Sequence, residues 1–147
     1  MKNVLADQRI YIDTSAIIPF YFKENFSAMT QDLFERYGLF QISELSKIEF
    51  YSTARKKARI GHTTNSEIEK VFRVFESHLN QGLFLITPFE KKHFKAATHI
   101  IKSTQNSLRS LDALHLGITY EEGLSVLSFD SIFNDTAQEF GISIISE

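Results

Sequence analysis

The sequence contains no cysteine, and no apolar run in it approaches the length of a membrane span. Without cysteine the chain can form no disulfide, no thiolate metal site and no cysteine nucleophile. The first ten residues, MKNVLADQRI, lack the apolar stretch of a signal peptide. We therefore expect a cytoplasmic protein whose chemistry does not depend on thiols.

The sequence also has no excess of positive charge. The formal net charge is −2 and the isoelectric point is about 6.2, which is not typical of a protein that grips duplex DNA by its phosphates. A nuclease is still possible, because a carboxylate cluster attracts phosphate once it holds metal ions. With 147 residues, 43% of them hydrophobic, we expect residues 1–147 to form a single globular domain.

Apolar strands alternate with helical patterns along the whole chain. This alternation predicts a three-layer α/β/α sandwich with a mainly parallel sheet of five strands. The expected strands are residues 9–13, 39–43, 83–87, 124–129 and 142–146. The expected helices are residues 15–22, 27–37, 44–60, 64–80, 89–104, 111–122 and 130–140.

Carboxylates occur at the places where such a sheet gathers functional groups. Asp13 ends one expected strand, Asp130 directly follows another, and Asp112 lies in the first turn of a helix. Glu49 is in the middle of a helix, on one face with Leu45 and Ile48. We expect these two apolar side chains to face the core and Glu49 to flank it.

Each acid has a purely structural interpretation when it is taken alone. Asp13 and Asp130 are in positions that favour helix caps, and Glu49 is in a position that suits a salt bridge. By the same reasoning we interpret His115 as a core histidine rather than a metal ligand, and Asp135 as a surface charge. Four converging carboxylates would repel one another, however, unless a hard cation such as Mg²⁺ or Mn²⁺ held them together.

The segments around the acids resemble the PIN-domain family, and within it the VapC-like toxins. The similar segments are YIDTSAIIPFYF, ISELSKIEF, SLDALHLGI, LSFDSIF and GISII, in that order along the chain. The resemblance implies a five-stranded parallel α/β/α sandwich and an acidic quartet of Asp13, Glu49, Asp112 and Asp130. It also implies supporting hydroxyls at Ser15 and Ser128. Pro19 departs from the family pattern and should shorten or kink the first helix.

The resemblance further implies a metal-dependent endoribonuclease that hydrolyses RNA, and a toxin paired with an antitoxin protein. Asp13 and Asp112 would hold the principal Mg²⁺ or Mn²⁺, with Glu49 and Asp130 contributing through water or a second ion. We also expect a homodimer or a higher oligomer.

The substrate and partner surfaces are less sharply marked. Arg109 is near enough to Asp112 to contact a phosphate. Two further basic clusters could bind RNA or simply be solvated: Lys56, Lys57 and Arg59 form one, and Lys91, Lys92 and Lys95 form the other. The aromatic residues 17–26 are either extra core or a groove for an antitoxin, and the stripe through Phe72 and Phe75 is either core or a dimer interface.

Three other functions remain as alternatives. The first is a housekeeping RNA-processing nuclease without an antitoxin, and the second is a non-catalytic binding module of the same fold. The third, an aspartyl phosphatase, usually needs a second Asp two residues after the first, where this chain has Ser15.

Overall fold

The side chains of the first strand, β1 (Ile10–Ile12), point alternately to the two faces of the sheet. Ile10 and Ile12 pack into one large apolar cluster, whereas Tyr11 packs on the opposite face with Ile118 and Leu124. All three strand residues are buried, as expected for a central strand covered on both faces. These positions come from a computed structural model, which describes residues 9–23, 27–37 and 39–145.

The strands form one parallel sheet in the order β3-β2-β1-β4. The other strands are β2 (Phe40–Ser43), β3 (Phe84–Thr87) and β4 (Ser125–Leu127). In the described part of the chain the sheet therefore has four strands, and the prediction of a fifth over residues 142–146 is wrong. That segment makes only a parallel bridge between Ile144 and Val126, and residue 146 lies outside the described residues.

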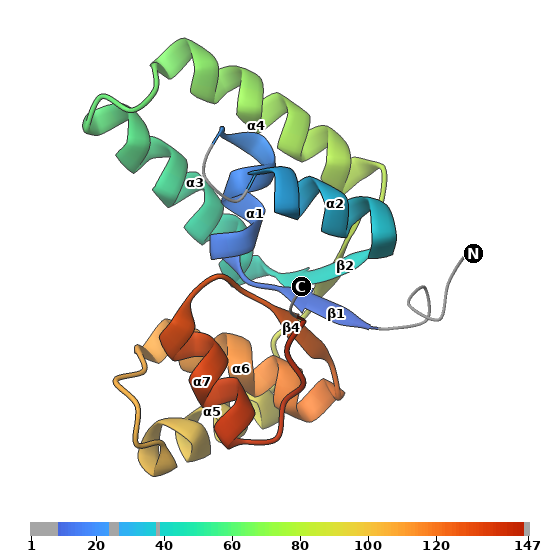
Figure 1. Ribbon diagram of the computed structural model, residues 1–147, viewed down its shortest axis with the longest axis vertical. Helices are drawn as coiled ribbons and strands as arrows, with labels where there is room; N and C mark the ends of the chain where they lie inside the picture. Colours follow the sequence, from blue (N-terminus) through green and yellow to red (C-terminus); the bar gives the residue numbers. More distant parts are fainter. Residues whose placement is uncertain (1–8, 24–26, 38, 146–147) are drawn as a thin grey trace.

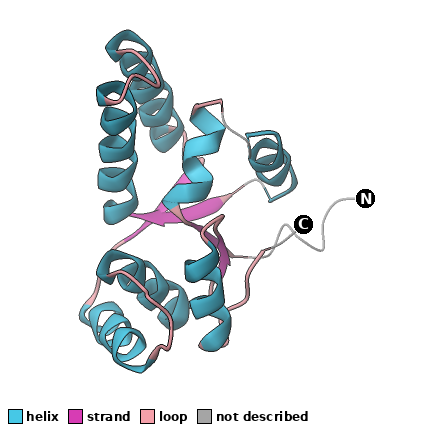
Figure 2. Ribbon diagram, turned by 60° about the vertical axis from the view of Figure 1, so that its left-hand side comes forward, coloured by secondary structure: helices cyan, strands magenta, loops and turns pink. Residues whose placement is uncertain are grey.

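Helices cover both faces of the sheet, which confirms the three-layer architecture (Figures 1 and 2). Helices α1 to α4 lie on one side, where α3 and α4 form a long antiparallel hairpin, and α5 to α7 lie on the other. None of the described helices is long and apolar enough to span a membrane. The helices are α1 (Thr14–Tyr21), α2 (Ser27–Tyr37), α3 (Glu44–Arg59), α4 (Asn65–Asn80), α5 (Lys91–Ser103), α6 (Ser110–Glu122) and α7 (Ser131–Glu139).

Aromatic side chains fill the core on the side of α1 to α4. Phe75 is fully buried and stacks on Phe50, with ring centroids 4.1 Å apart. Phe20 stacks on Phe34 at 4.3 Å, so the aromatic stretch that begins at residue 17 contributes to the core. Residues 24–26 of that stretch lie outside the described residues. Helix α1 also continues past Pro19 to Tyr21, so it is not shortened.

The face of α3 that meets the core differs from the expected one. Ile48 is 66% exposed, and the buried residues are Ser46, Phe50 and Ala54. Ser46 is buried because it completes a capping box with Ser43 at the start of α3. The apolar pattern predicted that Ile48 would face the core. In the structure the polar Ser46 faces the core instead, and Ile48 faces solvent.

Candidate active site

The carboxyl ends of two neighbouring parallel strands bring the first two acids together. Asp13 directly follows β1 and Asp130 follows β4, and these strands pair in register from Ile10 with Ser125 to Ile12 with Leu127. The starts of α3 and α6 bring Glu49 and Asp112 to the same edge. All four carboxylates line one cavity of about 610 Å³.

Two serine hydroxyls orient the carboxylate of Asp13. Its Oδ2 accepts hydrogen bonds from Ser15 Oγ at 2.7 Å and from Ser128 Oγ at 2.9 Å. Asp13 immediately precedes α1, but its side chain does not cap that helix. These are the two serines that the resemblance singled out. Asp13 is buried, and their hydrogen bonds hold its carboxylate at the cavity.

Glu49 is held by side chains from two other elements. Its Oε1 accepts a hydrogen bond from Thr14 Oγ1 at 3.0 Å and lies 2.5 Å from His115 Nε2. Burial alone would raise the pKa of this carboxyl, but the contacts with His115 and Thr14 and the charge of Arg109 hold the pKa below its ordinary value. Glu49 is therefore kept ionised at the cavity wall.

His115 is fully buried, as expected of a core histidine, but its contacts connect it to the quartet. Its Nδ1 lies 2.5 Å from the hydroxyl oxygen of Tyr11, which donates to Ser43 Oγ at 2.9 Å. A buried chain thus runs from the start of α3 through Tyr11 and His115 to Glu49. Sequence reasoning missed this link, because the spacing places His115 on one helix face with Asp112 but does not indicate its contacts with Tyr11 and Glu49.

Asp112 combines burial with nearby charges of both signs. Its Oδ2 accepts a hydrogen bond from Arg109 Nε at 3.2 Å. Burial raises the pKa of Asp112, the charges of Asp13 and Asp130 raise it further, and Arg109 offsets only part of the effect. The pKa of Asp112 is therefore raised mainly by its burial, with a smaller contribution from the neighbouring acids.

Asp130 has a structural role as well as a place at the cavity. Its Oδ1 accepts a hydrogen bond from the backbone N–H of Phe133 at 3.0 Å and so caps α7. The cap fixes the side chain beside Ser128, whose hydroxyl accepts from the Asp130 backbone N–H at 3.0 Å. The helix-cap interpretation of Asp130 is thus confirmed, and the cap does not remove the residue from the cavity.

The donor set of the cavity suits a hard divalent cation, because all four acids offer oxygen. The carboxylates are nevertheless spread out. Among the described residues, the one group of three acidic or histidine side chains whose ligand atoms all lie within 4.8 Å of one another is elsewhere, at Glu90, His93 and Glu122. In the observed arrangement one ion could therefore touch only some of the quartet directly.

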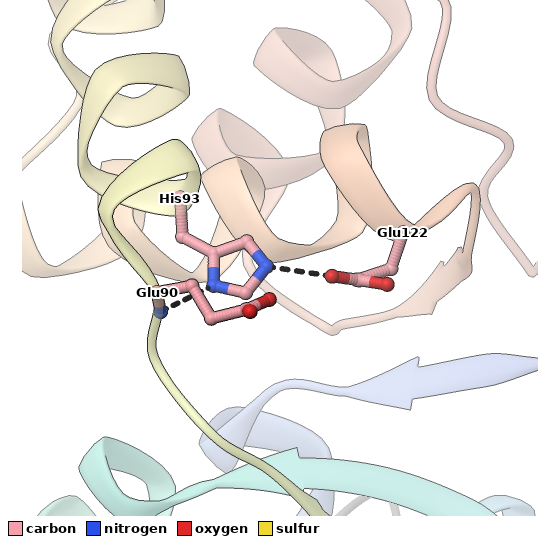
Figure 3. A group of neighbouring side chains, drawn as sticks. All are labelled: Glu90, His93 and Glu122. Carbon is pink, nitrogen blue, oxygen red and sulfur yellow. Dashed lines mark hydrogen bonds and ion pairs between the residues drawn. The ribbon is translucent and has the colours of Figure 1, made fainter.

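The second group joins two helices and does not resemble a metal centre (Figure 3). His93 is fully buried, and its Nδ1 accepts from the backbone N–H of Glu90 at 2.9 Å. Its Nε2 lies 2.7 Å from Glu122 Oε1, which also lies 3.1 Å from Lys92 Nζ. Because Nδ1 is an acceptor, Nε2 carries the ring proton and donates a hydrogen bond to Glu122 Oε1. Both ring nitrogens are thus occupied: Nδ1 closes the start of α5, and Nε2 links it to the end of α6.

The predicted basic residues divide between the cavity and the rest of the surface. Lys56, Lys57 and Arg109 line the same cavity as the four acids. Arg59 does not line it, and neither does the cluster of Lys91, Lys92 and Lys95 on α5. Asp135 is exposed on α7, as predicted.

A family model described as the PIN domain matches residues 10–139. No curated protein matches the chain. Similar solved structures include FitAcB from Neisseria gonorrhoeae, with a TM-score of 0.67 and 14% identity, covering 93% of this chain and 96% of that one. VapC20 from Mycobacterium tuberculosis, a toxin that cleaves the sarcin-ricin loop, has a TM-score of 0.66 and 11% identity, covering 86% and 93%. DNA-bound VapBC from Salmonella typhimurium has a TM-score of 0.61 and 18% identity, covering 94% and 97%. At these identities the similarity shows the fold alone.

Proposed function

The chain belongs to the PIN domain family, and from this we propose that it is a divalent-metal-dependent endoribonuclease that hydrolyses RNA phosphodiester bonds. The observation that carries the proposal is the convergence of Asp13, Glu49, Asp112 and Asp130 on one cavity. Burial raises the pKa of Asp112 and the charges of Asp13 and Asp130 add a smaller rise, so keeping this acid ionised at the cavity has an electrostatic cost. Carboxylates kept together at such a cost are characteristic of functional sites.

For the four acids we propose the roles that the family resemblance implies. Asp13 and Asp112 would hold the principal Mg²⁺ or Mn²⁺, with Glu49 and Asp130 contributing through water or a second ion. When bound, the ion would activate water for in-line attack and stabilise charge on the phosphate.

The chain's own side chains prepare the site. Ser15 and Ser128 fix the orientation of Asp13, and His115 and Thr14 fix Glu49. Arg109, which is exposed at the cavity, is placed to neutralise a phosphate oxygen.

RNA cleavage by purified variants tests the proposal. Structured and unstructured RNAs are incubated with Mg²⁺, Mn²⁺ or EDTA and with the wild type, Asp13→Asn or Asp112→Asn. Asp135→Asn is the matched control, because it removes an equal charge from the exposed face of α7. We expect cleavage by the wild type and the control, and none in EDTA or with the two quartet variants. Cleavage that persists in EDTA or in both quartet variants would contradict the mechanism.

We also propose that the nuclease is the toxin of a toxin–antitoxin pair. Supporting this, solved structures of similar fold include a toxin–antitoxin complex from Klebsiella pneumoniae and the Salmonella VapBC complex. Expression of the wild type should arrest growth, whereas Asp112→Asn should not. Equal growth of the two strains would count against the toxin role while leaving the cleavage activity to be judged by the RNA assay.

A further inference from the structure

One face of α3 connects the acidic end of the cavity to a basic end. Glu49, Thr53, Lys56, Lys57 and Ile60 all line the cavity. Their spacing of four, seven, eight and eleven residues from Glu49 places them on the same side of the helix. At 1.5 Å per residue, the row extends for roughly 16 Å. The cavity is therefore an elongated track that leads away from the quartet.

The basic residues of α3 are divided between this track and the packing of the α3–α4 hairpin. Arg55 is used structurally, because its Nη2 lies 3.1 Å from Glu69 Oε1 and its guanidinium lies over Phe72. In the described part of the chain, no carboxylate lies within salt-bridge distance of Lys56, which is exposed. Lys57 extends over the ring of Phe22, with Nζ 5.5 Å from its centroid. Two lysines thus line the track in a chain whose net charge is −2.

The walls between the two charged ends are partly apolar. Ile18, Pro19 and Phe129 line the cavity beside the acids, and Ile60, which is 55% exposed, lines it at the basic end. A ligand suited to this surface carries regularly spaced negative charges and flat apolar faces. Single-stranded RNA has both, because its phosphates can meet lysines while its unstacked bases lie on apolar side chains.

We propose that Thr53, Lys56 and Lys57 form a subsite for the backbone of single-stranded RNA beside the cleaved bond, so that the strand lies along α3. This inference rests on the proposed nuclease function, because it places the reacting phosphate at the quartet. Lys56 is seven residues from Glu49, or about 10 Å along the helix, so the phosphates it holds belong to neighbouring nucleotides. The subsite therefore acts on binding and positioning rather than on the bond that breaks.

RNA binding without cleavage tests the subsite. A fluorescein-labelled single-stranded RNA is titrated in EDTA over a range of salt concentrations, and anisotropy gives the affinity. The test variant is Lys56→Gln/Lys57→Gln. The matched control is Lys91→Gln/Lys95→Gln, which removes the same charge from exposed positions on α5 outside the cavity. Circular dichroism checks that both remain folded, and Lys56→Gln alone provides a variant at an exposed position.

We expect about tenfold weaker binding by the test variant and about a 1.4 reduction in the slope of log affinity against log salt, for two lost phosphate contacts on a single strand. The control should bind within about twofold of the wild type. In cleavage with metal, the test variant should raise KM with little change in kcat.

Two outcomes would overturn the inference. One is wild-type affinity and salt slope in the test variant. The other is unchanged RNA binding together with lost binding of a poly-glutamate peptide, which would assign the lysines to an acidic protein segment. Failure of the wild type to cleave any RNA would instead contradict the proposed nuclease function, whatever the binding results.

Discussion

Asp112 is the residue at which folding stability and the proposed function are most directly opposed. Burial raises its pKa, with Asp13 and Asp130 adding to the rise. A carboxyl with a raised pKa in the folded state favours folding most when it is protonated. Its contribution is fully present below the unfolded pKa near 3.8 and is lost as pH increases through the folded-state pKa. At neutral pH the ionised group therefore destabilises the folded chain.

Replacing this carboxyl with an amide should stabilise the protein in EDTA. We expect Asp112→Asn to raise the Tm by about 2 °C at pH 7, because the amide removes the buried charge and can still accept from Arg109. The difference should shrink as pH falls through the folded-state pKa of Asp112, because the carboxyl becomes protonated in the wild type. Thermal unfolding followed by circular dichroism measures both values. A lower Tm for the variant at pH 7 would mean that the ion pair with Arg109 outweighs burial.

His115 should act through Glu49. We expect His115→Ala to lower cleavage about 10- to 100-fold, as for other residues that orient a metal ligand. It should also lower the free energy of unfolding by about 2 kcal/mol, because Glu49 and the buried Tyr11 hydroxyl each lose a partner.

A double-mutant cycle distinguishes this positioning role from simple packing. In a Glu49→Gln background, the further loss of cleavage caused by His115→Ala should fall below about twofold. His115→Gln, which retains a donor, should recover part of the activity in the wild-type background. An equal loss in both backgrounds would indicate that His115 only fills space.

At the scale of elements, α5 and α6 approach each other closely at Gly117. A Cβ placed on this glycine would lie 2.4 Å from the backbone oxygen of His93 and 3.0 Å from the backbone nitrogen of Ala97. Backbone atoms cannot yield as a flexible side chain could. Gly117 therefore sets the distance between the two helices and, through α6, the position of Asp112 and His115.

Two effects predict opposite signs for Gly117→Ala, so the measurement decides between them. Helix propensity alone would stabilise the protein by about 1 kcal/mol. Overpacking against α5 should dominate and destabilise it by about 1–3 kcal/mol. Urea unfolding monitored by circular dichroism gives the net change. A gain in stability would show that the helices separate at little cost.

The elements that sequence patterns located best are the long helices with a clear apolar stripe. Helix α4 was expected over 64–80 and runs over Asn65–Asn80, because Thr64 caps it and Ile68 and Phe75 face the core. The last strand failed for a non-local reason. Val126 supplies both hydrogen bonds to this segment, one from its N–H to Ser143 and one from Ile145 to its carbonyl, and within residues 142–145 no further pair extends the ladder. An apolar run predicts that a segment is buried, but it does not predict how many residues of a neighbouring strand will pair with it.

Asp13 and Asp130 could be placed together from the sequence because parallel strands deliver their carboxyl ends to one edge, whereas Glu49 and Asp112 were grouped with them by the resemblance to the PIN-domain family. The contacts that orient Glu49 could not be located in this way. His115 is 66 residues from Glu49 and 104 from Tyr11, and no local pattern marks a hydrogen bond between three separate elements. The division of the basic clusters was equally inaccessible, because it depends on which side of α3 meets the cavity.

At the scale of the whole molecule, the described residues include two acidic groups that could hold a metal ion, and metal binding should distinguish them. The quartet has only oxygen donors around an open cavity. In the group of Glu90, His93 and Glu122, both nitrogens of the buried histidine are already hydrogen-bonded. We therefore expect a divalent ion to stabilise the folded chain through the quartet alone.

Thermal unfolding with and without Mn²⁺ tests this expectation. At ten times its dissociation constant, an ion bound only to the folded state adds about 1.4 kcal/mol, which for a chain of 147 residues corresponds to a Tm increase of about 3–6 °C. His93→Gln should lower the starting Tm, because it breaks the link between α5 and α6, but the increase with Mn²⁺ should remain. Asp112→Asn should show the reverse, with a higher starting Tm and a much smaller increase. If the increase disappeared in His93→Gln and persisted in Asp112→Asn, the ion would be bound between α5 and α6. That result would contradict metal binding by the quartet.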